Sequence, residues 1–301
     1  MDFTLASHGG GEIRCRLYEP EGTARAVFQI CHGMCEYLGR YERFIAFLQE
    51  NGFAVIGHDH AGHGHSAATP EDLGYFGPHG DETLVEDTRA VTGYAKERFP
   101  GLPVILMGHS MGSFITRAYL TKYGKELDGC IIMGTSGAVG ATGAGVLLAR
   151  LTAKLRGDRY RSPFVKKIAF SAYNKRIPDA KSPNAWLTKD EDVVKKYDKD
   201  PFCTYTFTAN GFETLFTLLQ RVSRADWADG VPKTLPVFLV SGEEDPVGQY
   251  GKGVRQVYDR LQKAGADVRM KLYPDCRHEI LNEPERETVY RDILAWCEEI
   301  L

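Results

Sequence analysis

Ser110 is surrounded by the residue types that a nucleophilic serine needs. The stretch GHSMG, residues 108 to 112, has the spacing G-x-S-x-G, follows the apolar run PVILM and precedes the amphipathic stretch SFITRAYLTKYG. This context predicts a strand, a sharp turn and a helix, with the hydroxyl of Ser110 exposed on the turn. Glycines at 108 and 112 permit the close backbone approach of such a turn. Ser136 in GTSGA is a weaker candidate, because Ala138 replaces the second glycine.

A base and an acid for this serine follow later in the chain. A serine hydroxyl becomes a nucleophile when a histidine removes its proton and a carboxylate orients that histidine. Asp245 follows the apolar run LPVFLVSG, and His278 lies in the loop after VRMKLYP. We predict that Ser110, His278 and Asp245 form a catalytic triad. Three other carboxylates remain as alternatives to Asp245, namely Glu243, Glu244 and Asp275.

Two backbone N–H groups are expected to stabilise the oxyanion of the reaction. One belongs to Met111, which follows the nucleophile, and the other to Met34 in CHGMCEY, at the end of an early strand. We further expect substrate contacts from His32, Gly33, His109, Phe207 and Phe212. A bracing role for His32, and a place in an apolar core for the two phenylalanines, are the alternatives.

Alternating strand-like and helix-like segments must position these residues. Apolar runs predict buried strands at 25–33, 53–59, 103–110, 130–136 and 235–242, a further strand at 268–274, and a half-buried edge strand at 12–20. Helices are predicted near 40–50, 81–98, 111–123, 249–264 and 284–300. Apolar strands separated by helices require a parallel sheet covered on both faces. The predicted fold class is therefore α/β, with a mostly parallel, doubly covered sheet.

Residues 137–232 interrupt this alternation and predict an inserted helical cap, or lid, on a core made of residues 1–136 and 233–301. Residues 146–176 carry nine Lys or Arg and one acidic residue, Asp158. Within them, VLLARLTAKL groups its leucines at helical spacing. One hypothesis is a lid that contacts anionic lipid surfaces or steers anionic substrates. The alternative is a solvated helix that packs its leucines on the sheet domain.

Five motifs resemble those of the α/β-hydrolase family, and most closely its monoacylglycerol lipase-like and lysophospholipase-like branch. They are HGMCE at 32–36, DHAGHGHS at 59–66, GHSMGS at 108–113, GEEDP at 242–246 and RHEILNE at 277–283. The order Ser, Asp, His is also that of this family. Tyr37 and Ser113 depart from the family pattern, where histidine and glycine are frequent.

The resemblance implies a cofactor-free serine hydrolase that cleaves esters of small lipids, such as monoacylglycerols or lysophospholipids, through an acyl-enzyme. It covers residues 1 to about 136 and about 233 to 301, and it leaves the cap unexplained. A serine aminopeptidase or an acyltransferase on the same fold is the alternative, since these enzymes differ in the pocket rather than in the triad.

Four histidines in GHDHAGHGHS, residues 57–66, raise a metal-dependent hydrolase as an alternative of another class. The spacing of His58, His60 and His63 imitates H-x-H-x-D-H, but Gly62 stands where that motif has an aspartate. The other interpretation is a tight loop in which Gly62 and Gly64 permit the turn, and Asp59 and Ser66 hydrogen-bond its backbone. The second interpretation predicts no metal site here.

Composition places the chain among ordinary globular proteins. The 301 residues are 43% hydrophobic and 26% charged, and a net charge of −3 gives no global attraction to nucleic acid. The seven cysteines include no CxxC pair, which favours reduced thiols in the cytosol. The start, MDFTLASHGGGEIRC, lacks the pattern of a signal peptide. We therefore expect a cytoplasmic protein that binds a small ester, with an oligomeric state that the sequence leaves open.

Overall fold

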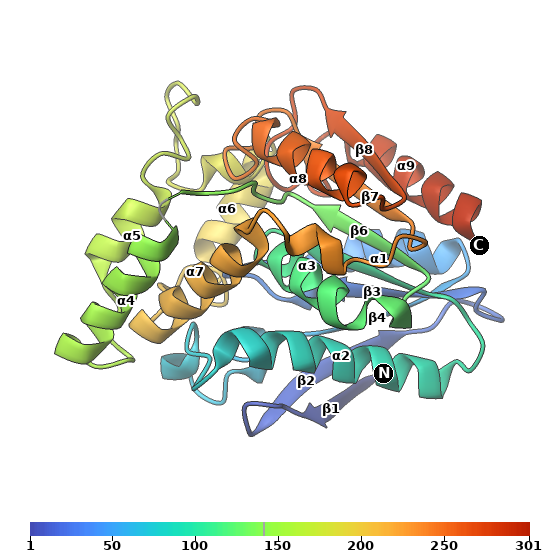
Figure 1. Cartoon of the computed structure of the whole chain (residues 1–301), viewed down its shortest axis with the longest axis horizontal. Coiled ribbons are helices and arrows are strands. Elements are labelled where there is room, and N and C mark those ends of the chain that lie inside the picture. Colours follow the sequence, from blue (N-terminus) through green and yellow to red (C-terminus); the bar gives the residue numbers. More distant parts are fainter. Residues whose placement is uncertain (141) are drawn as a thin grey trace.

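One mixed sheet of eight strands runs through the part of the chain that the structure describes (Figure 1). The structure is a computed structural model and describes residues 1–140 and 142–301. The spatial order is β1-β2-β4-β3-β5-β6-β7-β8. Neighbours from β4 to β8 are parallel, whereas β2 is antiparallel to both β1 and β4. The strands are β1 Asp2–Ala6, β2 Glu12–Tyr18, β3 Ala26–Cys31, β4 Phe53–His58, β5 Val104–His109, β6 Gly129–Met133, β7 Val237–Gly242 and β8 Val268–Tyr273.

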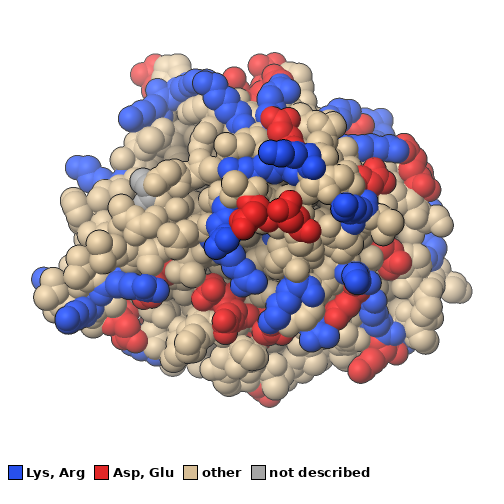
Figure 2. Space-filling view, viewed as in Figure 1, with Lys and Arg blue, Asp and Glu red and all other residues tan. Residues whose placement is uncertain are grey.

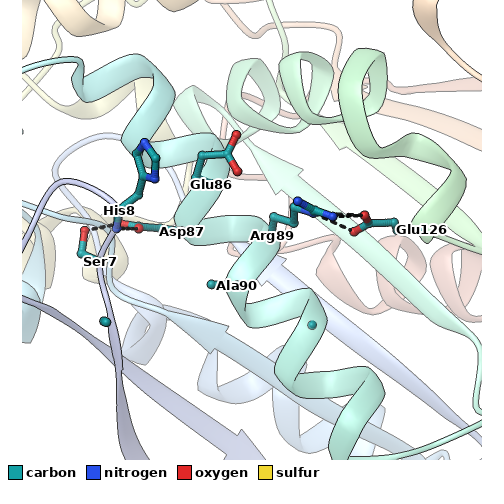
Figure 3. A pocket seen from close by; sticks show the side chains of 9 residues that line it. Ser7, His8, Glu86, Asp87, Arg89, Ala90 and Glu126 are labelled. Carbon is teal, nitrogen blue, oxygen red and sulfur yellow. Dashed lines mark hydrogen bonds and ion pairs between the residues drawn. The ribbon is translucent and has the colours of Figure 1, made fainter.

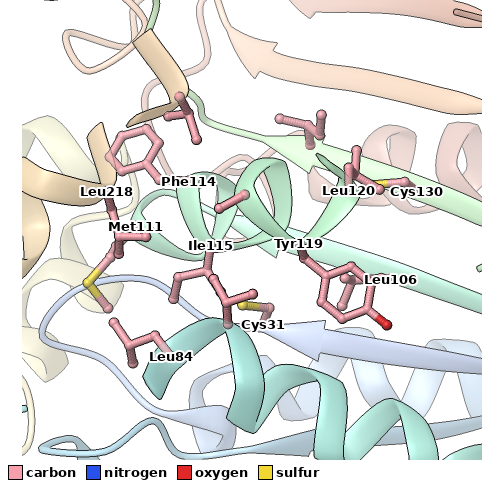
Figure 4. Close-up of a cluster of buried hydrophobic side chains, with 14 of the residues drawn as sticks. Cys31, Leu84, Leu106, Met111, Phe114, Ile115, Tyr119, Leu120, Cys130 and Leu218 are labelled. Atoms are coloured by element: carbon pink, nitrogen blue, oxygen red, sulfur yellow. The ribbon is translucent and has the colours of Figure 1, made fainter. Parts of the chain in front are cut away.

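Helices cover both faces of this sheet, as predicted. Helices α1 (Glu42–Glu50) and α9 (Arg286–Ile300) pack on one face, where Phe28 and Ile30 of β3 point. Helices α2 (Gly80–Arg98), α3 (Met111–Tyr123) and α8 (Lys252–Lys263) pack on the other face with Val27 and Cys31. Successive residues of a strand point to opposite faces, so the fully buried strand β3 supplies apolar side chains to both cores. Figure 4 shows α3 at the centre of the second core, between Leu84 of α2 and Leu218 of the later helix α7.

Residues 12–18 do not form an edge strand, which corrects the sequence-based prediction. The short strand β1 pairs with β2 from Asp2↔Arg16 to Ala6↔Glu12 and occupies the edge instead. On its other side β2 pairs with β4. The alternation of β2 therefore reflects one buried and one more exposed face of an internal strand.

The chain between β6 and β7 carries α4 Thr142–Arg156, α5 Pro163–Phe170, α6 Glu191–Lys199 and α7 Ala209–Ser223. Side chains of Ser162, Asp190 and Thr208 accept backbone N–H bonds at the starts of α5, α6 and α7, which explains where these helices begin. Helix α7 packs on α3, and α4 packs on α7. Figure 1 shows the segment beyond the carboxyl ends of the parallel strands. The boundaries of a separate cap at 137 and 232 stay a prediction.

Short 3₁₀ turns complete the connections: η1 Leu38–Tyr41, η2 Gly64–Ser66, η3 Pro70–Asp72, η4 Gly124–Glu126, η5 Ala185–Leu187 and η6 Trp227–Gly230. In the described ranges, each helix is too short or too polar to cross a bilayer.

Candidate active site

Ser110 occupies a strained turn between β5 and α3. Its backbone has φ +54° and ψ −119°, a conformation that residues other than glycine rarely adopt. The flanking glycines make the turn possible, because a Cβ at Gly112 would lie 2.1 Å from the carbonyl oxygen of Cys31. A Cβ at Gly108 would lie 2.2 Å from Oγ1 of Thr116. The G-x-S-x-G spacing therefore follows from the packing of this turn against β3 and α3.

Asp245 and His278 meet at the same edge of the sheet. Nδ1 of His278 lies 3.0 Å from Oδ2 of Asp245, although the angle falls short of a well-formed hydrogen bond. Asp245 is fully buried and accepts bonds from the Val247 N–H at 2.8 Å and the Ser241 hydroxyl at 3.2 Å. A Cβ at Gly242 would lie 2.0 Å from the carbonyl oxygen of Cys276, so this glycine lets the two loops cross. The carboxylate is thus fixed against the imidazole.

The imidazole of His278 lies beside the Ser110 turn. Its ring packs on the ring of His109, the residue before Ser110, with centroids 4.8 Å apart. A Cβ at Gly134 would lie 3.1 Å from His278 and 3.3 Å from His109, so the end of β6 backs both rings. The Ser110 hydroxyl makes no hydrogen bond to a described residue. Such bonds are often long in ligand-free enzymes and tighten when substrate binds.

The two predicted oxyanion donors flank Ser110. Met111 is the first residue of α3, where N–H groups have no partner within the helix. Gly33 is close to the serine, because a Cβ there would lie 2.9 Å from Cβ of Ser110. The N–H of Gly33 is engaged by the carboxylate of Glu36, whereas the N–H of Met34 bonds to no acceptor among the described residues. Both N–H groups are thus free to donate, and their role as an oxyanion hole stays a prediction.

A family model described as Serine aminopeptidase, S33, matches residues 22–285. The chain belongs to this Hydrolase_4 family of α/β-hydrolases. It is a serine hydrolase that resembles lipases and esterases. A monoacylglycerol lipase of Mycolicibacterium smegmatis is 30% identical, over 98% of this chain and 96% of the relative. The human monoglyceride lipase is 28% identical, over 97% of this chain and 88% of the relative.

The solved structures agree with the family assignment. A highly thermostable carboxyl esterase from Bacillus coagulans, in complex with glycerol, superimposes with a TM-score of 0.95 at 30% identity. The match covers 100% of this chain and 98% of the esterase. The α/β-hydrolase fold that the motifs implied is therefore confirmed.

The three rival carboxylates of the hydrolase are placed differently from Asp245. Glu243 and Glu244 are exposed, and neither forms an ion pair or hydrogen bond with His278 within the described residues. Asp275 is also exposed and has φ +58°, which is typical of a turn residue. Of the four carboxylates, Asp245 is the one in contact with the imidazole.

The predicted substrate-binding residues fall into two groups. Gly33 and His109 adjoin Ser110, whereas Phe207 and Phe212 are fully buried in the apolar core that also contains Met111. His32 is fully buried, and both of its ring nitrogens bond to backbone, Nδ1 to the carbonyl of Gly33 and Nε2 to the N–H of His60. The contacts of His32 are therefore those of a brace for the loop, and it offers no free polar atom to a ligand.

The histidine-rich loop of the hydrolase is held by its own hydrogen bonds. Nε2 of His60 donates to the carbonyl of His32, so its Nδ1 accepts from Nε2 of His58 at 3.0 Å. These bonds occupy both ring nitrogens of His60, whereas Nδ1 of His58 and Nε2 of His63 have no partner among the described residues. Asp59 accepts from the N–H groups of Leu38 and His65, and the Ser66 hydroxyl donates to the Asp59 carbonyl, as the loop interpretation predicted. In the described ranges, no cluster of three or more His, Cys, Asp or Glu could hold a metal.

The sequence did not predict Trp186, nor Glu36 and Tyr41, which bond to Nδ1 of His109. Trp186, from η5, packs on the imidazole of His278 with ring centroids 5.0 Å apart. Leu187 and Thr188, which follow Trp186, bind the loop that carries His278. The Glu279 N–H donates to the carbonyl of Leu187, and the Thr188 hydroxyl donates to the carboxylate of Glu283. The sequence does show one acidic residue in each of the motifs HGMCE and RHEILNE, Glu36 and Glu279. Their spacing in the chain does not indicate that they share a partner.

Two cavities lie outside the Ser110 turn. A groove of about 570 Å³ runs along the outer side of α2, where Ser7 and His8 bind Asp87 and Arg89 binds Glu126 (Figure 3). None of the candidate site residues lines this groove. A second cavity of about 170 Å³ lies between the inserted segment and the loops that carry Asp245 and His278. It is lined by Tyr173, Arg176, Ile177, Lys189, Glu244, Tyr250, Asp275 and Arg277.

Proposed function

We propose that this hydrolase cleaves carboxylic esters of small lipids, of the monoacylglycerol or lysophospholipid type, through a covalent acyl-enzyme. The observation that carries the proposal is the Asp245–His278 pair, at 3.0 Å, beside the strained Ser110 turn. The names of the full-length relatives, monoacylglycerol lipase and monoglyceride lipase, support the substrate class. The proposal needs no cofactor.

Acylation begins when Oγ of Ser110 attacks the ester carbonyl carbon and its proton passes to Nε2 of His278. The carbonyl oxygen becomes an oxyanion, which accepts hydrogen bonds from the N–H groups of Met34 and Met111. Asp245 orients the imidazole and stabilises its charged form. When the tetrahedral intermediate collapses, His278 returns the proton to the departing alcohol oxygen, and the acyl group stays on Ser110.

Deacylation repeats these roles with water. His278 takes a proton from a water molecule as its oxygen attacks the acyl carbon, and the same N–H groups hold the second oxyanion. The bond to Ser110 then breaks, the serine regains its proton from His278, and the fatty acid leaves.

A fluorophosphonate label tests the nucleophile directly. We expect peptide mass mapping to locate the label on Ser110, and Ser110→Ala to lower kcat by about 10⁴-fold. Ser136→Ala is the matched control, since Ser136 also follows a strand but is buried and should leave kcat unchanged. Retained activity in Ser110→Ala would refute the assignment.

A serine aminopeptidase is the second candidate, because the matching family model carries that description. The same triad serves amides and esters, so the pocket decides between them. Comparing chromogenic esters with aminoacyl anilides on the same preparation separates the two. We expect ester turnover, and an anilide activity greater than the ester activity would favour the peptidase.

The second part of the proposal is that α4 and α5 contact anionic lipid surfaces. Their outward side chains Leu147, Leu151, Leu155, Phe164 and Ile168 are between 48% and 78% exposed. Leu148 packs on the core, but the exposure of the other three α4 leucines argues against the alternative in which all of them pack on the sheet domain. Figure 2 shows Lys and Arg side chains at the margins of the largely uncharged surface at this end of the molecule. A bilayer offers both apolar and anionic partners to such a surface.

A further inference from the structure

A buried carboxylate, Glu36, ties the loop of the predicted oxyanion hole to the serine turn. One oxygen, Oε1, accepts hydrogen bonds from the N–H of Gly33, the hydroxyl of Tyr41 at 2.8 Å and Nδ1 of His109 at 3.0 Å. The Gly33 bond orients the His32–Gly33 peptide, which lies one residue before the N–H of Met34. The same carboxylate therefore contacts both residues that flank the reacting serine in space, Gly33 and His109.

Arg40 extends this contact to the loop that carries His278. Its guanidinium makes two parallel bonds to Glu279, at 2.6 Å and 2.8 Å, and one bond to Oε2 of Glu36 at 3.1 Å. Glu279 directly follows His278, and its N–H is bound by the carbonyl of Leu187. Paired arginine–carboxylate bonds of this kind fix orientation as well as distance.

The network is largely buried, and both of its carboxylates contact the guanidinium of Arg40. The side chains of Glu36, Glu279 and His109 are 4–5% exposed and that of Arg40 is 10% exposed. Burial alone would raise the pKa of Glu36, but the bonds from His109, Arg40 and Tyr41 outweigh it and lower the pKa to about 2. Burial alone would lower the pKa of His109, but the hydrogen bond and charge of Glu36 outweigh it and raise that pKa. Glu36 is therefore held ionised, and its charge is compensated.

We propose that Glu36 is a positioning residue. The bridge Glu36–Arg40–Glu279 holds the loop of Met34 and the turn of Ser110 at a fixed distance from the loop that carries His278. The inference rests on the proposed ester hydrolysis, because it assigns a role within that reaction. The three catalytic parts come from separate loops after β3, β5 and β8. Sheet packing alone leaves such loops free to shift, and misplacement by about 1 Å costs on the order of 10²-fold in rate.

Glu36→Gln tests the bridge, since it keeps the shape and removes the charge. We expect kcat to fall by about 10- to 100-fold while KM changes by less than about threefold, because the defect lies in transition-state geometry. A trifluoromethyl ketone, which Ser110 converts into an oxyanion adduct, should bind more weakly by the same factor as kcat/KM falls. If Glu36 had a purely structural role, Glu36→Gln would lower the thermal stability without an equal loss of ketone affinity and kcat/KM.

Glu279→Gln breaks the other end of the bridge without touching Glu36. We expect a smaller fall in kcat, about 5- to 10-fold, and a double variant whose loss is clearly less than the product of the two single losses. A double variant whose loss of kcat equals the product of the two single losses would overturn the proposed bridge. If Glu36→Gln does not fold, Glu279→Gln carries the test alone, and a wild-type kcat in that variant also overturns it.

Glu86→Gln is the matched control, because Glu86 bonds a lysine and a tyrosine on the surface of α2, away from the site. It should keep wild-type kcat and ketone affinity. A folded Glu36→Gln with wild-type kcat would refute the positioning role but leave the proposed function standing, provided Ser110→Ala is inactive. An active Ser110→Ala would instead refute the proposed function itself.

Discussion

At the scale of single residues, the choice of carboxylate is the sharpest test of the proposed triad. Asp245→Asn should lower kcat by about 10⁴-fold, because the amide no longer orients the imidazole or stabilises its charge. Asp275→Asn should leave kcat near the wild-type value, since Asp275 is an exposed turn residue three positions before His278. Steady-state kinetics on one ester substrate compares both. A large loss in Asp275→Asn alone would reassign the acid.

Residue types and spacing predict the members of the site but not the contacts between their supports. G-x-S-x-G carries a packing requirement that the sequence displays, because any Cβ at Gly108 or Gly112 would collide with neighbouring atoms. Glu36 and Glu279 are separated by most of the chain, and their common partner Arg40 is visible only once the strands are assembled. His32 was expected to contact the substrate, with a bracing role as the alternative, and its bonds to Gly33 and His60 fit the alternative.

At the scale of elements, the exposed faces of α4 and α5 predict binding to anionic vesicles. Replacing Leu151 and Leu155 with serine should reduce co-sedimentation with phosphatidylglycerol vesicles, because each leucine loses about 1.5–3 kcal/mol of apolar transfer. Activity on a water-soluble ester should be unchanged. Neutral phosphatidylcholine vesicles supply the comparison for charge, and equal binding to both lipids would remove the electrostatic part of the proposal.

Elements with a strong apolar period were predicted to within a few residues, whereas β1 was missed. Its five residues, DFTLA, include two polar side chains and are only partly buried, so they lack the pattern of a core strand. The strand exists because β2 offers a free edge, and pairing with an edge requires backbone rather than side chains. The position of β2 was therefore misjudged for the same reason.

At the scale of the whole molecule, the histidine-rich loop links folding to pH. His32, His58, His60 and His63 are buried, and burial lowers the pKa of each, to about 4 for His60 and about 3 for His63. The unfolded chain takes up these protons near pH 6.5, whereas the folded chain does not. His109 acts in the opposite sense, because its folded-state pKa is raised, and its stabilising contribution is fully developed below pH 6.5.

The free energy of unfolding should therefore fall as pH drops from 6.5 to 5, by about 1.4 kcal/mol per pH unit for each histidine that stays neutral in the folded chain. Urea unfolding across this range measures the slope of the unfolding free energy against pH. His63→Phe should lower this slope by the share of one histidine, because one fewer proton is taken up on unfolding. The ring of His63 packs against Phe76 and Phe207 and its Nε2 has no partner among the described residues, so phenylalanine fits the site. His8→Gln, which replaces an exposed histidine, is measured beside it as the comparison for a histidine outside the buried loop. A slope that His63→Phe leaves unchanged would mean that His63 is protonated in the folded chain.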